Sequence, residues 1–460
     1  MQLPEKFITL MREQLGESQA VELCDALGRE PSTSVRLNPW KPAPLKWEGR
    51  QIAWSEYGFS LAERPQFTLD TDFHAGLYYV QEASSQFAGY IVESVMGGKE
   101  ACRGMRVLDV CAAPGGKSTH YAALVGPEGL VVANEINHAR ADVLADNARK
   151  WGLGNIVVSC NDSSRLSALE QMFDVVAVDA PCSGEGMFRK SEDASEQWSE
   201  ANVALCAERQ WEILQNVFQT LAPGGVLIYS TCTFNRREDE DVVERLCENF
   251  GDELMAAPPV CIDESWGVAK AQVGVFQTFR FFPHKVNGEG MFMAVACKGG
   301  ERRQTRLPKA KRKVISAVDK RDEAELRRWL KDGEDKAFFV AGKMLYAARK
   351  EHYPLIDYLS STLSVIYSGV AMGQIFKGVL KPDGALAFYI DLCREALPCV
   401  EVTEDVALQF LRRADISVEG FTEGLNLVVC RGQALGFVKR IGARMNNLYP
   451  QSLRILKREN

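Results

Sequence analysis

Residues 106–117 read RVLDVCAAPGGK, an apolar run of strand length that enters a glycine-bearing turn and then the helical pattern KSTHYAALV. Further apolar runs follow, separated by helical patterns: LVVANEI, NIVVSC, FDVVAVDAP and GVLIYSTC. Near-continuous apolar strands that alternate with helices are typical of a parallel sheet covered on both faces. Two later runs, FQTFRFF and GMFMAVACK, predict an antiparallel addition at its edge. The sequence therefore predicts a doubly wound α/β domain.

The glycine turn is neither of the common phosphate-binding motifs. A P-loop needs glycine at the position that Cys111 occupies, and GxGxxG is absent. In doubly wound sheets, ligands bind beyond the carboxyl ends of the strands, beside such a turn. Glu135 follows the second strand, where an acid accepts from ribose hydroxyls, and Asp162 follows the third, where a carboxylate could accept from an adenine amino group. The pattern indicates a nucleoside ligand without a phosphate anchor, and S-adenosylmethionine (SAM) fits.

Two cysteines end separate apolar strands. Cys182 lies in DAPCSGEG and Cys232 in YSTCT, each in a loop of small residues. A cysteine chosen at random is most often a buried structural thiol. Two thiols at the same end of one parallel sheet favour a reactive pair instead.

Composition limits the remaining possibilities. A chain of 460 residues predicts two or three domains. Its 13 cysteines form no CxxC pair and its 5 histidines are isolated, so we expect reduced thiols and no metal site. No apolar run approaches the ~20 residues of a membrane span, and the N-terminus resembles no targeting segment. A cytoplasmic protein without a membrane association is expected.

Basic residues gather in two segments although the net charge is −7. These are 298–313 and 431–460, and each is compatible with a solvated surface or with a polyanion partner. The first reads as a linker. We expect an N-terminal RNA-binding or positioning region over 1–100, the α/β core over 101–300, a basic linker over 301–330 and a β-rich C-terminal region over 331–460, with a hairpin turning near Gly432.

Three motifs in order, DVCAAPGGK, DAPCSGEG and YSTCT, resemble the Sun-family RNA 5-methylcytosine methyltransferases. VRLNP (35–39), YYVQEASSQ (78–86) and FRFFPHKVNGEGMFMA (279–294) fit the same family. The pattern is most similar to the bacterial RsmF-like branch, which methylates cytosine in small-subunit ribosomal RNA. VVCRGQALGFVKR looks like part of a PUA-type RNA-binding module. The resemblance implies a Rossmann-like SAM-dependent core flanked by RNA-binding regions.

The resemblance also assigns roles to residues. Cys232 matches the family's nucleophile, which adds to cytosine C6, and Cys182 matches the cysteine that promotes product release. DNA cytosine methyltransferases use a proline-cysteine pair like Pro181-Cys182 as the nucleophile, so the reverse assignment is the alternative. Asp179 matches the carboxylate at the cytosine N3/N4 edge, and Lys117 neighbours substrate and cofactor. The expected cofactor-binding residues are Cys111, Ala112, Ala113, Pro114, Gly115, Gly116, Lys117, Glu135, Asp162 and Asp179.

The expected function is SAM-dependent methylation of cytosine C5 in 16S ribosomal RNA through a covalent Cys–C6 intermediate. The alternatives are a tRNA enzyme of the same family and a noncatalytic RNA-binding protein on this scaffold. Ribosomal RNA or the small subunit is the expected partner of a monomer. Arg36 and Asn38 match an RxN element that supports RNA binding or packing, and His284 is expected to be structural or to face RNA.

Overall fold

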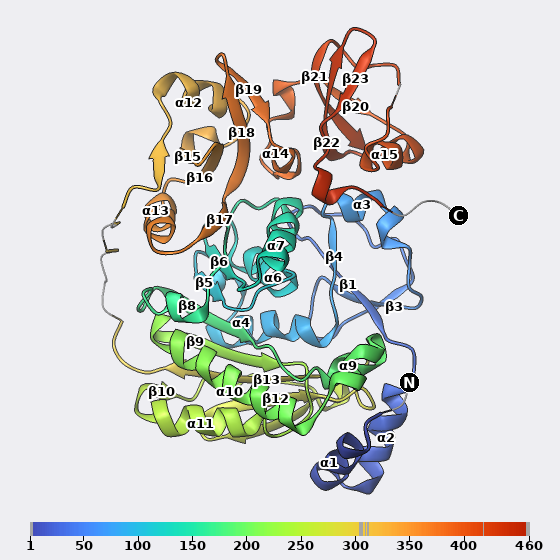
Figure 1. Ribbon diagram of the computed structural model, residues 1–460, viewed down its shortest axis with the longest axis vertical. Helices are drawn as coiled ribbons and strands as arrows, with labels where there is room; N and C mark the ends of the chain where they lie inside the picture. The colour runs from blue at the N-terminus through green and yellow to red at the C-terminus, as the bar shows by residue number, and fades with distance from the viewer. Residues whose placement is uncertain (1–2, 303–306, 309, 311, 417, 457–460) are drawn as a thin grey trace.

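The computed structural model describes residues 3–302, 307–308, 310, 312–416 and 418–456. A 10-stranded sheet with the order β11-β12-β13-β9-β8-β5-β6-β7-β17, plus β10 beside β13, forms its centre (Figure 1). Five parallel strands make up the middle of this sheet: β5 (Arg106–Asp109), β6 (Leu130–Asn134), β7 (Ile156–Ser159), β8 (Phe173–Asp179) and β9 (Leu221–Thr231). Their side chains are almost all buried because helices cover both faces. The predicted doubly wound α/β core is confirmed.

The helices divide between the two faces of the sheet. α4 (Phe87–Met96), α6 (Gly116–Val125) and α7 (His138–Trp151) pack in a row on one face. α8 (Ser163–Leu166), α10 (Glu200–Val217) and α11 (Glu240–Phe250) pack on the other (Figure 1). α5 (Lys99–Cys102) lies beside α4. This division is the one that right-handed crossovers between parallel strands produce.

Antiparallel strands extend the sheet beyond β9. β13 (Met291–Lys298) pairs with β9 on one side and with β12 (Phe276–Phe281) on the other. β11 (Ala269–Val273) and β10 (Leu254–Met255) complete this side. The two late apolar runs thus form antiparallel strands as predicted, and β11 lies outside them as the edge strand.

The N-terminal region consists of a helix pair and a small sheet. α1 (Glu5–Leu15) and α2 (Glu17–Leu27) form the pair, and the sheet has the order β2 (Gly49–Gln51), β3 (Gly58–Leu61), β1 (Thr33–Leu37), β4 (Tyr78–Val80). α3 (Thr71–His74) precedes β4. The helix pair packs against the segment after β8, where the 3-10 helix η3 (Glu185–Lys190) and α9 (Glu192–Gln197) lie, through an edge-on contact of Phe7 with Phe188.

The RxN element joins the N-terminal sheet to the core. Arg36 is only 1% exposed and donates to Gln81 Oε1 (2.7 Å), Gly116 O (3.1 Å) and Thr119 Oγ1 (2.8 Å). Asn38 Nδ2 donates to the carbonyl oxygens of Gly76 (3.0 Å) and Trp151 (3.1 Å). The Trp151 carbonyl lies in the last turn of α7, whose carbonyls have no partner within the helix. These hydrogen bonds give both residues a packing role.

The C-terminal region forms two further sheets. The first has the order β14 (Ile315–Ala317), β15 (Lys336–Ala341), β16 (Met344–Arg349), β18 (Val370–Phe376), β19 (Val379–Pro382). The second has the order β20 (Cys399–Glu401), β21 (Gly424–Cys430), β22 (Gln433–Ile441), β23 (Arg444–Asn447). The helices of this region are α12 (Lys320–Arg327), α13 (Tyr353–Thr362), α14 (Gly384–Phe388) and α15 (Glu404–Leu411). The hairpin predicted near Gly432 joins β21 to β22, with positive φ at Arg431 (53°) and Gly432 (74°), as a type I′ turn requires.

One strand of the C-terminal region belongs to the central sheet. β17 (Val365–Ser368) pairs antiparallel with β7. The loop before it is also bonded to the end of β7, because the amide of Cys160 donates to Ser364 O (2.9 Å) and the amide of Ser364 donates to Asn161 Oδ1 (3.0 Å). A boundary near residue 330 therefore does not separate the sheets, and the C-terminal region is not structurally independent of the core. Local periodicity carries no information on which strand a run will pair with.

Part of the expected basic linker contacts the core. Lys298 is buried at the end of β13, where it lies 3.6 Å from Glu253 Oε2 and 4.8 Å from the Phe218 ring centroid. Arg302 pairs with Asp174 (2.5 Å). The basic residues Arg303, Arg306, Lys309 and Lys311 lie outside the described residues. In the described part of the chain, every helix is too short or too polar to cross a bilayer.

Replacing Asn38 with alanine should destabilise the junction between the N-terminal sheet and α7. The substitution removes two side-chain donors and leaves buried carbonyls unpaired, which costs about 1–3 kcal/mol of unfolding free energy. Urea titration followed by circular dichroism measures the loss. Asn249→Ala, on the exposed face of α11, is the matched control. Equal midpoints for the two variants would contradict a role for Asn38 in this junction.

Candidate active site

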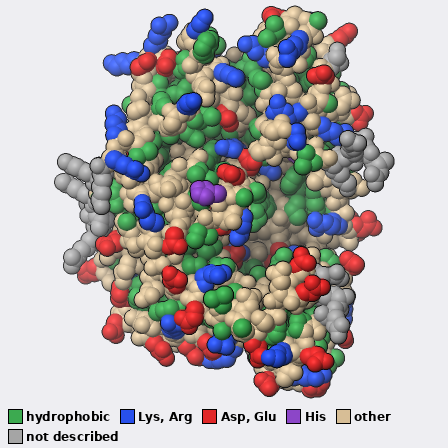
Figure 2. Space-filling model, in the orientation of Figure 1, with side chains coloured by type: hydrophobic (Ala, Val, Ile, Leu, Met, Phe, Trp, Pro, Cys, Tyr) green, Lys and Arg blue, Asp and Glu red, His purple; other side chains and the backbone are tan. Residues whose placement is uncertain are grey.

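The loops that leave β5, β8 and β9 meet at one edge of the sheet because these three strands are neighbours and run parallel. β8 leads to α9, and in the space-filling view the surface is hollowed above α9, where Figure 1 draws strands of the N-terminal sheet (Figure 2). Ligand sites in doubly wound folds form at this edge, beyond the carboxyl ends of the strands. The predicted glycine turn and both predicted thiols lie in these loops.

The glycine turn is held from three directions. Gly115 has φ 110°, which a side chain would disfavour, and α6 begins at the next residue. Arg140 Nη2 donates to Ala113 O (3.1 Å), and Asn147 Nδ2 donates to Pro114 O (2.8 Å). Tyr79 OH also donates to Pro114 O (3.2 Å). The turn therefore presents its backbone and the first amides of α6 in a fixed geometry.

Asp109 ends β5 directly beneath this turn. Its Oδ2 accepts from Ser118 Oγ (2.6 Å), whereas Oδ1 is buried and has no hydrogen-bond partner in the described part of the chain. Burial raises the pKa of Asp109 to about 7. A buried carboxyl oxygen without a partner marks a place where a ligand donor would be accepted.

Glu135 and Asp162 follow β6 and β7 as predicted, but their surroundings differ. Glu135 is 3% exposed, accepts from the amide of Asn137 (3.0 Å) and lies 3.5 Å from Arg140 Nη2. The adjacent apolar Ile136 is 63% exposed. Asp162 is exposed and accepts from Ser164 N (2.9 Å) at the N-terminus of α8, which lowers its pKa. The structure thus gives Asp162 a helix-capping contact.

Asp179 and Lys117 form an ion pair that joins the loop after β8 to the loop after β5. Lys117 Nζ lies 2.8 Å from Asp179 Oδ2, and Ser230 Oγ donates to Asp179 Oδ1 (2.8 Å). Burial alone would lower the pKa of Lys117, but the neighbouring carboxylates, Asp179 first, raise it above its usual value. Lys117 therefore stays cationic, and both oxygens of the Asp179 carboxylate are oriented.

The two predicted thiols are in contact. Cys182 Sγ and Cys232 Sγ lie 3.2 Å apart, and both cysteines are partly exposed. The amide of Gly186 donates to Cys232 O (2.9 Å), which ties the loop after β8 to the loop after β9. The hydrogen bond between the thiols, together with burial, raises the pKa of Cys182. Cys182 is consequently a neutral thiol near pH 7.

Buried carboxylates behind the thiols bind the two loops together. Glu185 accepts from Thr233 Oγ1 (2.6 Å), from the amides of Phe234 (2.7 Å) and Asn235 (3.0 Å) and from Trp198 Nε1 (2.9 Å). A second carboxylate, Glu238, accepts from Ser183 N (2.9 Å), Gln210 Nε2 (2.8 Å) and Asn235 Nδ2 (2.8 Å). Each loop thus supplies an acid that the other loop satisfies.

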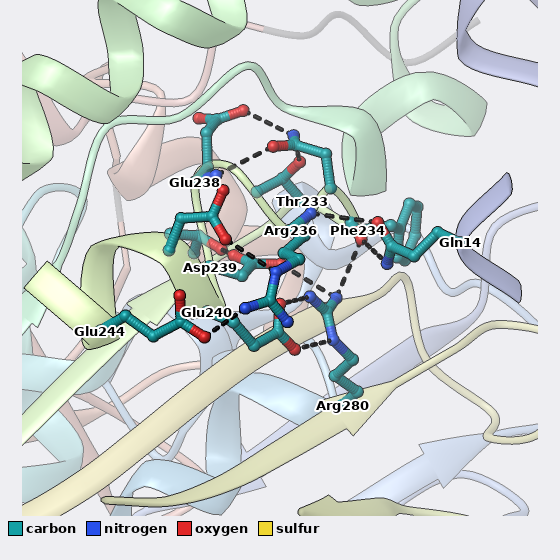
Figure 3. A network of polar contacts seen from close by, with 12 residues as sticks. Gln14, Thr233, Phe234, Arg236, Glu238, Asp239, Glu240, Glu244 and Arg280 are labelled. Carbon is teal, nitrogen blue, oxygen red and sulfur yellow. Dashed lines mark hydrogen bonds and ion pairs between the residues drawn. The ribbon is translucent and has the colours of Figure 1, made fainter. Parts of the chain in front are cut away.

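An arginine binds the end of the loop after β9 through ion pairs and a hydrogen bond (Figure 3). Arg280, on β12, pairs with Asp239 Oδ2 (2.9 Å) and with Glu240 Oε2 (2.5 Å), and it donates to Phe234 O (3.0 Å). Gln14, from α1, donates to the same Phe234 carbonyl (2.6 Å). The N-terminal helix pair therefore also supports the loop that carries Cys232.

Sequence reasoning brought the glycine turn, Lys117, Asp179, Cys182 and Cys232 to one site, and the structure places them together. It missed the supporting residues Glu185, Glu238 and Arg280. The acids following each cysteine in DAPCSGEG and TCTFNRRE were the available signal. His284 lies outside this set, with its ring 5.5 Å from that of Phe282. Within the described ranges, no group of three or more metal-ligating side chains gathers.

Comparison with known proteins agrees with this arrangement. Residues 100–296 match the family model described as 16S rRNA methyltransferase RsmB/F. Residues 3–83 match the N-terminal domain of 16S rRNA methyltransferase RsmF, and residues 397–455 match the methyltransferase RsmF PUA domain. A methyltransferase homolog protein from Pyrococcus horikoshii shares the fold at 23% identity, with a TM-score of 0.52 over 65% of this chain and 100% of that one.

Two curated relatives match over nearly their full length. The ribosomal RNA small subunit methyltransferase F of Erwinia tasmaniensis is 30% identical over 98% of this chain and 96% of its own. The protein of the same name from Escherichia coli O7:K1 is 31% identical over the same shares. The chain belongs to the ribosomal RNA small subunit methyltransferase F family.

Proposed function

We propose that this protein transfers a methyl group from SAM to C5 of cytosine in 16S ribosomal RNA through a covalent adduct between Cys232 and C6. The observation that carries the proposal is the pair of thiols 3.2 Å apart at the carboxyl ends of β8 and β9. Cytosine C5 is a weak nucleophile, and addition of a thiolate at C6 makes it reactive enough to accept a methyl group. We place this activity in the cytoplasm.

The residues around the glycine turn fit SAM. Asp109 Oδ1 is a buried acceptor without a partner among the described residues, and Glu135 is a nearly buried acid. The turn 111–116 offers backbone groups to a ligand, but it is not a phosphate-binding P-loop. Bound there, SAM supplies an electrophilic methyl group. We assign its binding to Cys111, Ala112, Ala113, Pro114, Gly115, Gly116, Lys117, Glu135, Asp162 and Asp179, with Asp109 added from the structure.

Cys232 acts as the nucleophile and Cys182 assists at the end of the reaction. The Cys182 thiol is neutral and can donate its S–H to the sulfur of Cys232, which stabilises the thiolate that attacks C6. After C5 is methylated, its proton passes to a water molecule, the electrons of the C5–H bond form the C5–C6 double bond again, and Cys232 leaves as a thiolate. Cys182 is placed beside that departing sulfur throughout.

Asp179 orients the cytosine ring. Lys117 and Ser230 each engage one of its oxygens, so the carboxylate is fixed in position while it stays partly exposed. A carboxylate there accepts from the N4 amino group and holds the ring in place for the attack on C6. Lys117 offsets the negative charge of Asp179 through their ion pair.

The full-length match to small subunit methyltransferase F relatives supports ribosomal RNA over tRNA as the substrate. The PUA-domain match over 397–455 supports RNA contacts by the C-terminal region. The assembled acids and thiols favour catalysis over a noncatalytic scaffold.

Glu135→Ala should weaken SAM binding because it removes a buried acceptor proposed to hold the ribose. Loss of such a contact costs about 1–3 kcal/mol of binding free energy. Isothermal calorimetry with the folded variant measures the change, and Glu248→Ala on the exposed face of α11 is the control. If SAM affinity is the same in both variants, Glu135 does not belong to the cofactor site.

The two cysteine variants should fail differently. Cys232→Ala cannot attack C6, so it should be inactive and form no adduct. Cys182→Ala should attack and methylate but release product slowly, so RNA should stay attached through Cys232. Denaturing gels with labelled RNA separate the two outcomes, because only Cys182→Ala should give a shifted band.

Two results would count against these roles. A shifted band for Cys232→Ala alone would exchange the two cysteines and favour the assignment known from DNA enzymes. Full methylation by Cys232→Ala without any adduct would rule out a thiol mechanism at this site.

RNA affinity should depend on salt through the β22–β23 hairpin. Lys439 and Arg444 are exposed on it, and each phosphate contact contributes about one unit to the slope of log K against log salt. The double variant Lys439→Gln, Arg444→Gln should flatten the slope and leave SAM binding intact. Filter binding at several salt concentrations measures it, with Lys377→Gln, Lys381→Gln as the control. Equal slopes in wild type and hairpin variant would remove this hairpin from the RNA interface.

A further inference from the structure

A cavity of about 250 Å³ lies between the N-terminal sheet and the helices α4, α5 and α6. It is separate from the proposed cofactor site, since none of the residues assigned to SAM lines it. Its inner wall adjoins the helix that carries Lys117, whereas its rim precedes β5, at the opposite edge of the sheet from the thiols. His120, in its wall, lies one helical turn after Lys117 on α6. Arg36, also in the wall, donates to Gly116 O, next to Lys117 (3.1 Å).

Four aromatic side chains line this cavity, and three are fixed by their polar atoms. Trp40 Nε1 donates to Ala123 O (3.1 Å), Trp54 Nε1 donates to Ala83 O (2.9 Å) and Tyr90 OH donates to Cys261 O (2.6 Å). These bonds use up the polar atoms and leave the apolar rings to form the walls. The fourth, Tyr57, is 37% exposed at the edge of the cavity.

Two polar groups in the wall lack partners. Arg36 Nη1 and His120 Nδ1 are buried, and no hydrogen-bond partner for either exists among the residues that the structure describes. Arg36 is 1% exposed overall. Burial lowers the pKa of His120, so its ring is neutral and offers one donor and one acceptor. Both atoms are closed to solvent, so they mark unsatisfied polarity beside the cavity, which a ligand atom that reached them would satisfy.

The rim of the cavity is cationic on one side. Lys99 is half-buried there and Arg103 is exposed; Lys99 lies 5.4 Å from the Tyr57 ring centroid and Arg103 lies 5.0 Å from that of Trp40. Two acids also line the cavity: Glu56, which pairs with Lys99, and Glu93. Cations beside aromatic rings are the arrangement that single-stranded nucleic acid requires, because the bases stack while the phosphates remain outside.

We propose that this cavity binds one unstacked nucleobase of the ribosomal RNA other than the target cytosine. The inference rests on the proposed function for its identification of RNA. The cavity is smaller than the ~300 Å³ of the smallest drug-sized pockets, which suits one heterocycle and excludes a run of nucleotides. The base stacks on the fixed rings, its edge pairs with Arg36 and His120, and its phosphate lies toward Lys99 and Arg103.

Ultraviolet cross-linking tests the proposal whichever cytosine of the RNA is modified. The full-length protein is irradiated with naked 16S ribosomal RNA or with small subunits, digested, and analysed for nucleotide-bearing peptides by mass spectrometry. A nucleotide attached to Trp40, Trp54, Tyr57 or Tyr90 is the expected result. Cross-links confined to peptides elsewhere in the chain would overturn the proposal.

Kinetics provide a second, independent measurement. Tyr57→Ala and His120→Ala should each raise KM for ribosomal RNA on the order of tenfold, with kcat and SAM affinity little changed, because they remove stacking or edge contacts only. Tyr57→Phe should restore KM. Phe376→Ala, at an exposed aromatic of β18, is the matched control, and thermal melting verifies that each variant is folded. Unchanged KM in both folded variants would overturn the proposal.

The test also separates an RNA base from a free nucleotide. Free AMP, GMP, CMP or UMP should not abolish the cross-link to RNA. If a free nucleotide quenches tryptophan fluorescence and no RNA cross-link forms at these residues, the cavity is a nucleotide site and the RNA proposal is wrong. Methylation at a position other than cytosine C5 would refute the proposed function but leave the cross-linking result to decide this one.

Discussion

The proposed active site depends on two buried carboxylates, each of which accepts hydrogen bonds from the loop that carries the other. Glu185 follows Cys182 in the chain and is satisfied by the loop of Cys232, whereas Glu238 follows Cys232 and is satisfied in part by the loop of Cys182. Removing a buried carboxylate from water is costly unless several donors replace the lost hydration. Here some of the donors to each acid come from the opposite loop, so neither acid is fully satisfied unless both loops are in place. The 3.2 Å separation of the thiols follows from this reciprocal arrangement.

Local patterns predicted much of the fold and of the site. The strands from β5 to β9, the turn that ends in Gly116 and the cysteines at two strand ends are each specified within about ten consecutive residues. The partners of Glu185 and Glu238 are not specified locally. Thr233 lies 48 residues from Glu185 in the chain, and Ser183 lies 55 residues from Glu238. Pairing across such distances depends on which strands become neighbours, and the periodicity of a single strand leaves that choice open.

The support for the site extends well beyond the central sheet. Gln14 holds the loop after β9 from one side of the molecule, and Arg36 holds the first turn of α6 from another. Both residues belong to the N-terminal region, which the sequence indicated only as a region that positions RNA. Because the same region fixes groups of the proposed catalytic centre, RNA contacts there and the geometry of the thiols are physically connected.

The pairing of β17 with β7 has a consequence for biosynthesis. The core strands through β13 end at Lys298, but the sheet gains its last strand only when Ser368 has been made. Until then the nascent chain has an open edge on β7, a strand whose side chains are all buried in the finished protein. Unpaired apolar edges are templates for association between chains. During translation, the protein therefore passes through an interval in which most of its core is present and its most vulnerable edge is still uncovered.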